Sequence, residues 1–250
     1  VRFTPRFNPE VNGYWMCDIG RFEYHWIEGD GRLRQPLVRE GDSGQRPLSW
    51  RELMSKLGDR LTAAGRSNPE GTRFLISAHA SNEELFLFRR LTDDLLGEHG
   101  PKSVTLGWRH RPKSQPADTA FKVPPVDAPN LDGARAMGFA AGKVGDEAGP
   151  ADLSDLRSAI EARRVSALYV FDPGPDGSIG DTQWIVDART SGALPLLIVQ
   201  GVLSTALARV ADFVLPGASY VEKEASYTND QGRLQGASRV MAPPGEAMED

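Results

Sequence analysis

Short apolar runs alternate with stripes of apolar residues at helical spacing along most of this chain. Five runs predict strands, at residues 73–77, 103–106, 166–171, 194–199 and 213–215. Continuous apolar runs without a polar alternation are typical of parallel strands that are covered on both faces. The helical stripes between them imply right-handed crossovers. We therefore predict an α/β fold, a doubly wound and mainly parallel sheet with helices on both faces.

Capping boxes mark the starts of two predicted helices. Ser49 is an N-cap with Glu52 reaching back to it, and Ser81 and Glu84 repeat the pattern. Gly97 ends the second helix. The predicted inner faces are Leu53, Leu57 and Leu61 in the first helix and Leu85, Phe88, Leu91 and Leu95 in the second. Three further helices are predicted at residues 153–160, 182–190 and 204–209.

Two stretches lack this alternation. Residues 1–45 are rich in aromatic residues and arginine and show no sustained period, which predicts a small irregular N-terminal piece. Residues 46–250 are then one α/β domain. Within it, residues 109–150 carry repeated prolines and predict an extended linker, interrupted by a brief helical patch at 131–137.

Composition narrows the classes of function. The 250 residues are 40% hydrophobic and 25% charged, as in ordinary globular proteins. A net charge of −5 argues against non-specific binding to nucleic acid, which needs a basic surface. No apolar run approaches the roughly 20 residues that span a bilayer, so we expect no direct membrane insertion. A single cysteine rules out an internal disulfide and fits a reducing compartment. Without an initiator methionine, Val1 is a candidate for a cut or processed end.

A long polar segment follows the last predicted strand. Pro216 and Gly217 end that strand. Proline has no backbone N–H to donate to a neighbouring strand, and glycine readily adopts the backbone angles of a turn. Asn229, Arg233 and Gln235 then offer several donors without a nucleophile–base pair. Loops at the carboxyl edge of an α/β sheet often carry function. The segment therefore predicts a loop that holds a ligand; a well hydrogen-bonded surface loop is the structural alternative.

Other candidate chemistry is sparse. Cys17 is either a buried small apolar residue or a thiolate metal ligand. Metal and cluster sites need about four ligands, and no C-x-x-C occurs, so the chain alone does not complete one. His79 follows a predicted strand, where α/β proteins place functional groups. The other histidines (His25, His99 and His110) form no i, i+4 pair, and no dinucleotide or P-loop motif occurs.

The motifs together carry a resemblance. Residues 8–12, 15–22 and 32–39 resemble the end of the iron–sulfur domain of the molybdopterin oxidoreductase superfamily. Within it, the chain is most similar to the G subunit of bacterial NADH-quinone oxidoreductase (respiratory complex I). Weaker matches are residues 81–84 and 167–173, and a more specific one is residues 211–235. The resemblance covers most of the chain except the linker.

The resemblance implies roles for particular residues. Cys17 matches the fourth cysteine ligand of a [4Fe–4S] cluster, whose three partners would come from upstream of Val1 or from another chain. Residues 109–150 stand where catalytic relatives carry an inserted domain that ligates molybdenum. The loop of Glu222, Thr228, Asn229 and Arg233 matches the segment that lines the pterin site in those relatives. With the metal-ligand domain missing, we expect a structural relic of that site and no bound molybdopterin.

Two hypotheses of different class result. The first is a component similar to the G subunit that supports the iron–sulfur arm of a respiratory NADH-quinone oxidoreductase and performs no catalysis itself. Its partners would be other subunits of the peripheral arm of a membrane-associated complex, on the cytoplasmic side of the inner membrane. Exposed N-terminal aromatics would form an interface. The alternative is a pterin- or nucleotide-binding oxidoreductase domain, similar to formate dehydrogenase, that holds its ligand at residues 227–235.

Overall fold

The structure is a computed structural model that describes residues 2–41, 44–114, 117, 124–139 and 149–249. The chain divides into two compact units, Val1–Arg32 and Leu33–Asp250. The sequence placed this boundary at residue 45. The structural division falls earlier because β1 (Leu37–Arg39) pairs with both β2 (Gln45–Pro47) and β9 (Phe213–Pro216) and so joins the sheet. Residues 42–43 lie outside the described part.

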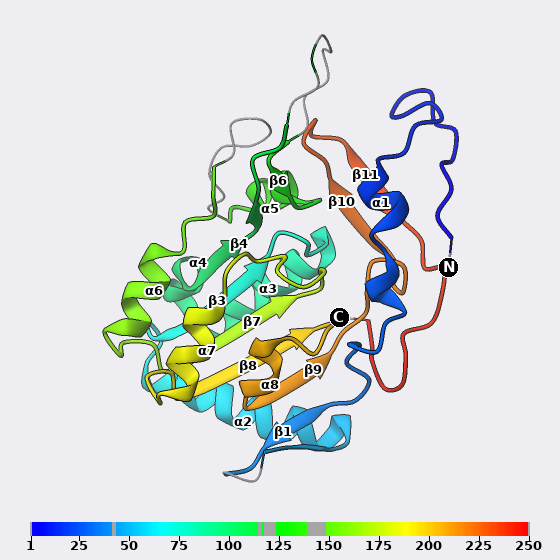
Figure 1. The fold of residues 1–250 in the computed structure, drawn as a ribbon. Helices are drawn as coiled ribbons and strands as arrows, with labels where there is room; N and C mark the ends of the chain where they lie inside the picture. The colour runs from blue at the N-terminus through cyan, green and yellow to red at the C-terminus, as the bar shows by residue number, and fades with distance from the viewer. Residues whose placement is uncertain (1, 42–43, 115–116, 118–123, 140–148, 250) are drawn as a thin grey trace. The chain divides into compact units, whose positions relative to one another are not determined.

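A seven-stranded sheet organises the larger unit, in the order β2-β1-β9-β8-β7-β3-β4 (Figure 1). Five strands run parallel to one another, and β1 and β2 form an antiparallel edge. The parallel strands are β3 (Thr72–Ser77), β4 (Val104–Gly107), β7 (Ala167–Asp172), β8 (Leu196–Gly201) and β9. All five coincide with predicted strands to within two residues at each end. The doubly wound, mainly parallel sheet is therefore confirmed.

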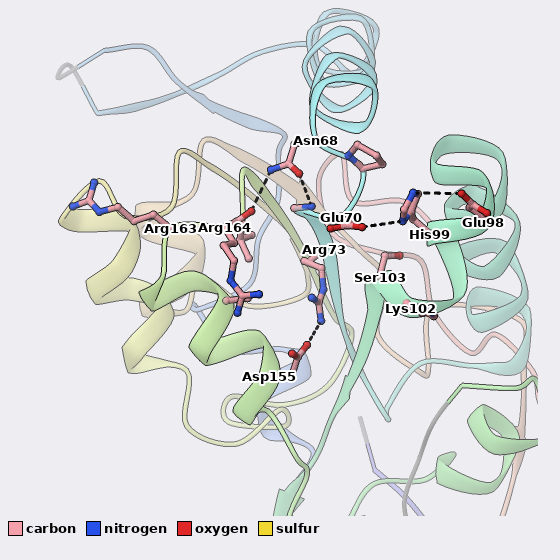
Figure 2. Close-up of a pocket in the computed structure, with 14 residues that line it drawn as sticks. Asn68, Glu70, Arg73, Glu98, His99, Lys102, Ser103, Asp155, Arg163 and Arg164 are labelled. Atoms are coloured by element: carbon pink, nitrogen blue, oxygen red, sulfur yellow. Dashed lines mark hydrogen bonds and ion pairs between the residues drawn. The ribbon is translucent and has the colours of Figure 1, made fainter.

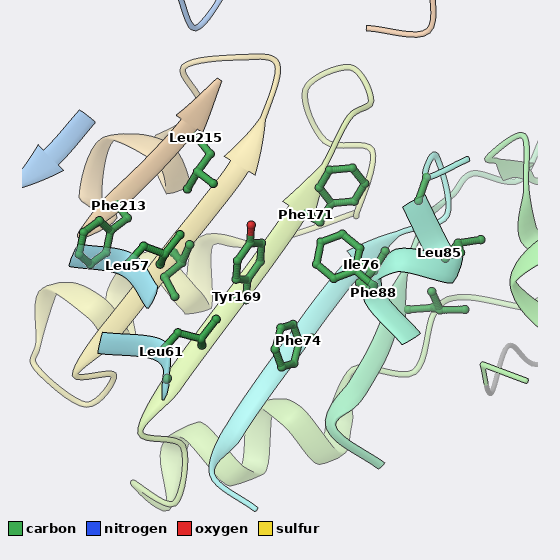
Figure 3. Packing of buried hydrophobic residues seen from close by; sticks show 14 of the residues in the cluster. Leu57, Leu61, Phe74, Ile76, Leu85, Phe88, Tyr169, Phe171, Phe213 and Leu215 are labelled. Atoms are coloured by element: carbon green, nitrogen blue, oxygen red, sulfur yellow. The ribbon is translucent and has the colours of Figure 1, made fainter. Parts of the chain in front are cut away.

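Both faces of the sheet are covered, because successive strand residues enter different cores. One core contains Phe74, Tyr169 and Phe171 (Figure 3); the other contains Leu75 and Val170. Helices α2 (Trp50–Ser67) and α3 (Asn82–Leu96) pack on the first face. Helices α6 (Ser154–Glu161), α7 (Gln183–Thr190) and α8 (Ala206–Val210) pack on the second. The Tyr169 ring stacks on Phe74 with the ring centroids 5.7 Å apart.

Both predicted capping boxes are present, at Ser49 and Ser81. The inner face of α2 is buried as predicted, but that of α3 differs. Leu91 is 38% exposed, and Thr92 and Leu96 are buried in place of the predicted Leu91 and Leu95. The period of 3.6 residues carries the face from Phe88 to Thr92, and the Thr92 hydroxyl is satisfied by donating to the Arg89 carbonyl. A short 3-10 turn (Gly97–His99) and α4 (Gly100–Ser103) then lead into β4.

The linker and the polar C-terminal segment contain more regular structure than predicted. In the linker, β5 (Arg109–His110) pairs with β6 (Val126–Asp127), and α5 (Leu131–Ala136) occupies the predicted helical patch. Residues 115–116, 118–123 and 140–148 of the predicted linker lie outside the described part. The segment after β9 is not one long loop, because β10 (Ala225–Thr228) and β11 (Leu234–Ala237) form an antiparallel hairpin.

The smaller unit is irregular, as its sequence predicts. It contains α1 (Asp18–Phe22) and a 3-10 turn at His25–Ile27. A tight turn brings the Gly13 amide to the Asn8 carbonyl at 2.7 Å. Aromatic pairs supply local packing, with the ring centroids of Phe7 and Tyr14 4.5 Å apart.

Candidate functional site

The carboxyl edge of the sheet has a topological switch point between β3 and β7. From β3 the chain continues to β4 on one side, whereas β7 leads through β8 to β9 on the other. Doubly wound folds bind ligands where connections diverge in this way. The loops after β3 and β7 therefore form the candidate site.

Side chains of the two loops are joined by hydrogen bonds at this point. The Ser178 hydroxyl donates to the Asp172 carboxylate and lies 3.0 Å from the Ser77 hydroxyl oxygen. The Gly174 amide donates to the same carboxylate oxygen at 3.1 Å. A Cβ at position 174 would lie 2.8 Å from Cγ of His79 and 2.7 Å from Cβ of Ser178. The switch point is thus filled by the chain's own packed side chains, and only glycine fits at position 174.

Two titratable groups at the switch point have shifted pKa values. Burial raises the pKa of Asp172 from 3.8 to about 7, against the hydrogen bonds from Ser178 and Gly174, which lower it. Burial lowers the pKa of His79 from 6.5 to about 4, against its bond to the Asp127 carbonyl. That bond joins Nε2 of His79 and the carbonyl oxygen at 2.9 Å. Asp172 therefore changes charge near neutral pH, whereas His79 stays neutral there.

The predicted loop residues lie on and before the hairpin. Glu222 is buried, and its carboxylate accepts from the Ser219 amide at 2.8 Å. Thr228 lies on β10. Asn229 begins the turn, where its side-chain oxygen accepts from the amides of Gln231 at 3.1 Å and Arg233 at 2.9 Å. Asn229 thus stabilises its own turn, and Arg233 is exposed beyond it.

A buried amide that the sequence did not single out fixes this hairpin. Asn130 is fully buried, accepts from the Thr228 amide at 2.7 Å, and donates to the Ala80 carbonyl at 2.7 Å. It also lies 3.2 Å from the Asn82 side-chain oxygen. A Cβ at Gly133 would lie 2.2 Å from both the Asn130 and the Asn82 oxygens. The only sequence signal was an asparagine immediately before the helical patch, in N-cap position.

A buried ion pair lies beside this amide. The Lys223 ammonium contacts the Glu84 carboxylate, and both side chains are 4% exposed. Glu84 also completes the capping box of α3 by accepting from the Ser81 amide at 2.7 Å. Glu83, the residue before Glu84, also contacts the hairpin, because its carboxylate accepts from the Ser226 amide at 2.9 Å. The start of α3 and the hairpin region are therefore held together by charged groups.

Cys17 belongs to the smaller unit, immediately before α1. It is exposed, and its sulfur accepts from the Gly20 amide at 3.3 Å. A Cβ at Gly20 would lie 3.3 Å from that sulfur. Amide donors of this kind stabilise a thiolate that ligates a metal or cluster. Among the residues that the structure describes, no group of three or more Cys, His, Asp and Glu side chains could hold a metal ion.

Two cavities lie in different parts of the larger unit. One of about 220 Å³ lies between the linker and the hairpin turn, with Val126, Leu131, Asn229 and Asp230 in its wall. A larger cavity of about 760 Å³ lies at the opposite, amino edge of the sheet, next to Gly71 and Arg73 (Figure 2). The sequence predicts no membrane-spanning helix, because it contains no apolar run long enough to span a bilayer. Within the described part of the chain, no helix is long and apolar enough to cross a membrane.

Part of the sequence matches a known family. Residues 130–250 match the family model described as Molybdopterin oxidoreductase. The match to this family thus covers residues 130–250, a little under half of the chain. The fold is similar to that of acetylene hydratase from Pelobacter acetylenicus, with a TM-score of 0.57. That likeness covers 98% of this chain and 63% of the hydratase at 10% identity, so it concerns the fold alone.

Curated relatives that match part of this chain include subunits of two different oxidoreductases. The alpha subunit of F420-dependent formate dehydrogenase 1 from Methanococcus maripaludis is 40% identical over 92 residues, 37% of this chain and 13% of that protein. The second G subunit of NADH-quinone oxidoreductase from Rhizobium meliloti is 35% identical over 97 residues, 39% of this chain and 11% of that protein. The matched stretches thus span only about an eighth or less of these relatives. Both are named as subunits of oxidoreductases.

Proposed function

We propose that this domain is a component of a respiratory NADH-quinone oxidoreductase, similar to its G subunit, that supports the iron–sulfur arm and performs no molybdenum catalysis. The packed switch point is the observation that carries the proposal. His79 and Ser178 leave no room for a side chain at Gly174, so the chain itself occupies the place where a doubly wound sheet binds a ligand. The 35% identity to the G subunit of Rhizobium meliloti is consistent with this role.

Within this proposal, Cys17 is the fourth ligand of a [4Fe–4S] cluster. Its exposed sulfur and the Gly20 amide fit a cluster thiolate. The other three ligands would come from outside the described residues. When bound, the cluster supplies one-electron transfer. The partners would be other subunits of the peripheral arm, on the cytoplasmic side of the inner membrane. The exposed Tyr14 and Trp15 would lie at such a contact.

The test is the cofactor content of the full-length native protein, purified anaerobically. Wild-type protein is expected to hold about four more irons than its Cys17→Ser variant, with molybdenum and pterin substoichiometric in both. A Met16→Leu variant is the control for a change beside the cysteine, and it should keep the iron. Equal iron in all three proteins would contradict the role of Cys17. Stoichiometric pterin would contradict the non-catalytic role.

A second candidate is a pterin- or nucleotide-binding domain similar to formate dehydrogenase. The cavity of about 220 Å³ beside Asn229 and Asp230 favours it, because this turn belongs to the predicted pterin loop. The 40% identity to a formate dehydrogenase alpha subunit favours it too. Under this alternative, pterin would copurify with the protein and would be lost on substitution of Asn229.

A further inference from the structure

The cavity of about 760 Å³ at the amino edge of the sheet has no role in the proposed function. Its wall comes from four segments: the end of α2 with the turn after it, the start of β3, the turn and short helix before β4, and α6 with the turn after it. Small-molecule sites are of similar size, about 300–1,000 Å³. Because the switch point is at the carboxyl edge, a ligand here would bind at a distinct site.

Cations line several sides of this cavity. Arg73, Lys102 and Arg164 all contribute to its wall, and Arg164 extends toward Arg73 in Figure 2. The Arg73 guanidinium bonds Asp155 at 2.7 Å, but its Nε is buried with no partner among the described residues. Lys102 and Arg164 form no ion pair with a described residue. The Arg73 side chain is only 14% exposed, whereas Lys102 and Arg164 are both exposed. The cavity therefore combines one largely buried guanidinium with two accessible cations.

The carboxylates of the cavity pair with only one of these three cations. Asp155 is paired with Arg73 and is itself 80% exposed. Glu70 and Glu98 each lie 3.9 Å from a ring nitrogen of His99, and their side chains are 82% and 91% exposed. They are grouped around the imidazole on one side of the cavity (Figure 2). Two cations therefore remain without a carboxylate partner in the described part of the chain.

Carbonyl groups at the end of α6 accept hydrogen bonds from the chain itself, so their negative ends are not left free to repel an anion in the cavity. The Arg163 amide donates to the Ile160 carbonyl and the Arg164 amide to the Ala159 carbonyl, both at 2.9 Å, which is a Schellman ending. The Arg164 carbonyl accepts from the Asn68 side chain at 3.2 Å. Arg163 has a φ of 56°, a left-handed conformation that glycine normally supplies at this position. The chain thus keeps an arginine beside the cavity where backbone geometry favours glycine.

We propose that this cavity binds a small, multiply charged phosphate anion of the diphosphate class. Guanidinium groups match phosphate oxygens in paired hydrogen bonds, and Lys102 adds a point charge from another wall. Cations on separate walls suit an anion with more than one charged group. The lining is polar, which disfavours a ligand with a large apolar body.

Inorganic pyrophosphate, titrated calorimetrically into the full chain at low ionic strength, tests the proposal. One saturable site is expected, and the Lys102→Gln/Arg164→Gln double variant should bind at least about tenfold more weakly. Arg51→Gln/Arg60→Gln is the matched control, because both arginines are exposed on α2 away from the cavity. The control should stay within about twofold of wild type. Thermal unfolding verifies that both double variants are folded.

Three results would overturn the proposal. They are the absence of saturable pyrophosphate binding, equal weakening in the two double variants, and binding of an acidic peptide but not of pyrophosphate. The last result would identify the cavity as a contact for a protein partner.

Discussion

Replacement of Lys223 by methionine is expected to lower the free energy of unfolding by about 3–5 kcal/mol. The variant leaves the Glu84 carboxylate buried without the ammonium that it contacts in the wild type. A buried charge that loses its counter-ion costs far more than an exposed one, because water no longer solvates it. Urea denaturation of the variant and the wild type measures the difference.

Two comparisons isolate the buried charge. In the Glu84→Gln/Lys223→Met double variant both charges are gone, and the glutamine still accepts from the Ser81 amide, so the loss should be smaller than in Lys223→Met. Arg157→Met removes an exposed i, i+4 pair with Glu161, and we expect a change of at most about 0.5 kcal/mol. If Lys223→Met costs no more than Arg157→Met, the buried pair does not hold α3 to the hairpin region.

The Asp172→Asn variant is expected to gain stability relative to wild type as the pH rises. The folded pKa of Asp172 is about 7, above its ordinary value of 3.8, so between these values the native state binds the extra proton. Wild-type stability therefore falls through this window, by up to about 1.4 kcal/mol per pH unit from this group. Asparagine cannot ionise, and its oxygen can still accept from Ser178 and Gly174. Denaturation at several pH values measures the stability difference between variant and wild type.

His79 supplies a control, because its effect on stability as the pH rises is opposite to that of Asp172. Its folded pKa of about 4 is below 6.5, so between these values the unfolded state binds the extra proton and stability rises with pH. In wild type the two groups oppose each other from about pH 4 to 6.5. A His79→Gln variant, whose amide can still donate to the Asp127 carbonyl, should lose stability relative to wild type as the pH rises. If the two variants change in parallel, the shifts at the switch point are not those inferred here.

The sheet and most helices could be predicted from sequence, because their signals are local. The boxes at Ser49 and Ser81 mark helix starts by contacts three residues apart. The error at Leu91 has a similarly local cause. The spacing of leucines predicts Leu91 on the inner face. The turn angle of the helix instead buries Thr92, whose hydroxyl donates to the Arg89 carbonyl.

The arrangement of the candidate site could not be predicted, because its contacts join distant residues. Asn130 and Thr228 are 98 positions apart, and Glu84 and Lys223 are 139 apart. The spacing of apolar residues along the sequence carries no signal of contacts between residues so far apart. The hairpin did have a signal, since residues 229–232 carry turn formers between two short β-prone runs. Its polar residues instead suggested a loop that holds a ligand.

Anaerobic affinity purification of the full-length native protein, with mass spectrometry of the chains that accompany it, is the most direct test of the proposed role. The account predicts that NADH-binding and quinone-side subunits of one assembly copurify with it. A polypeptide that purifies alone would contradict the subunit role, leave Cys17 as an ordinary exposed thiol, and favour ligand binding at the hairpin turn.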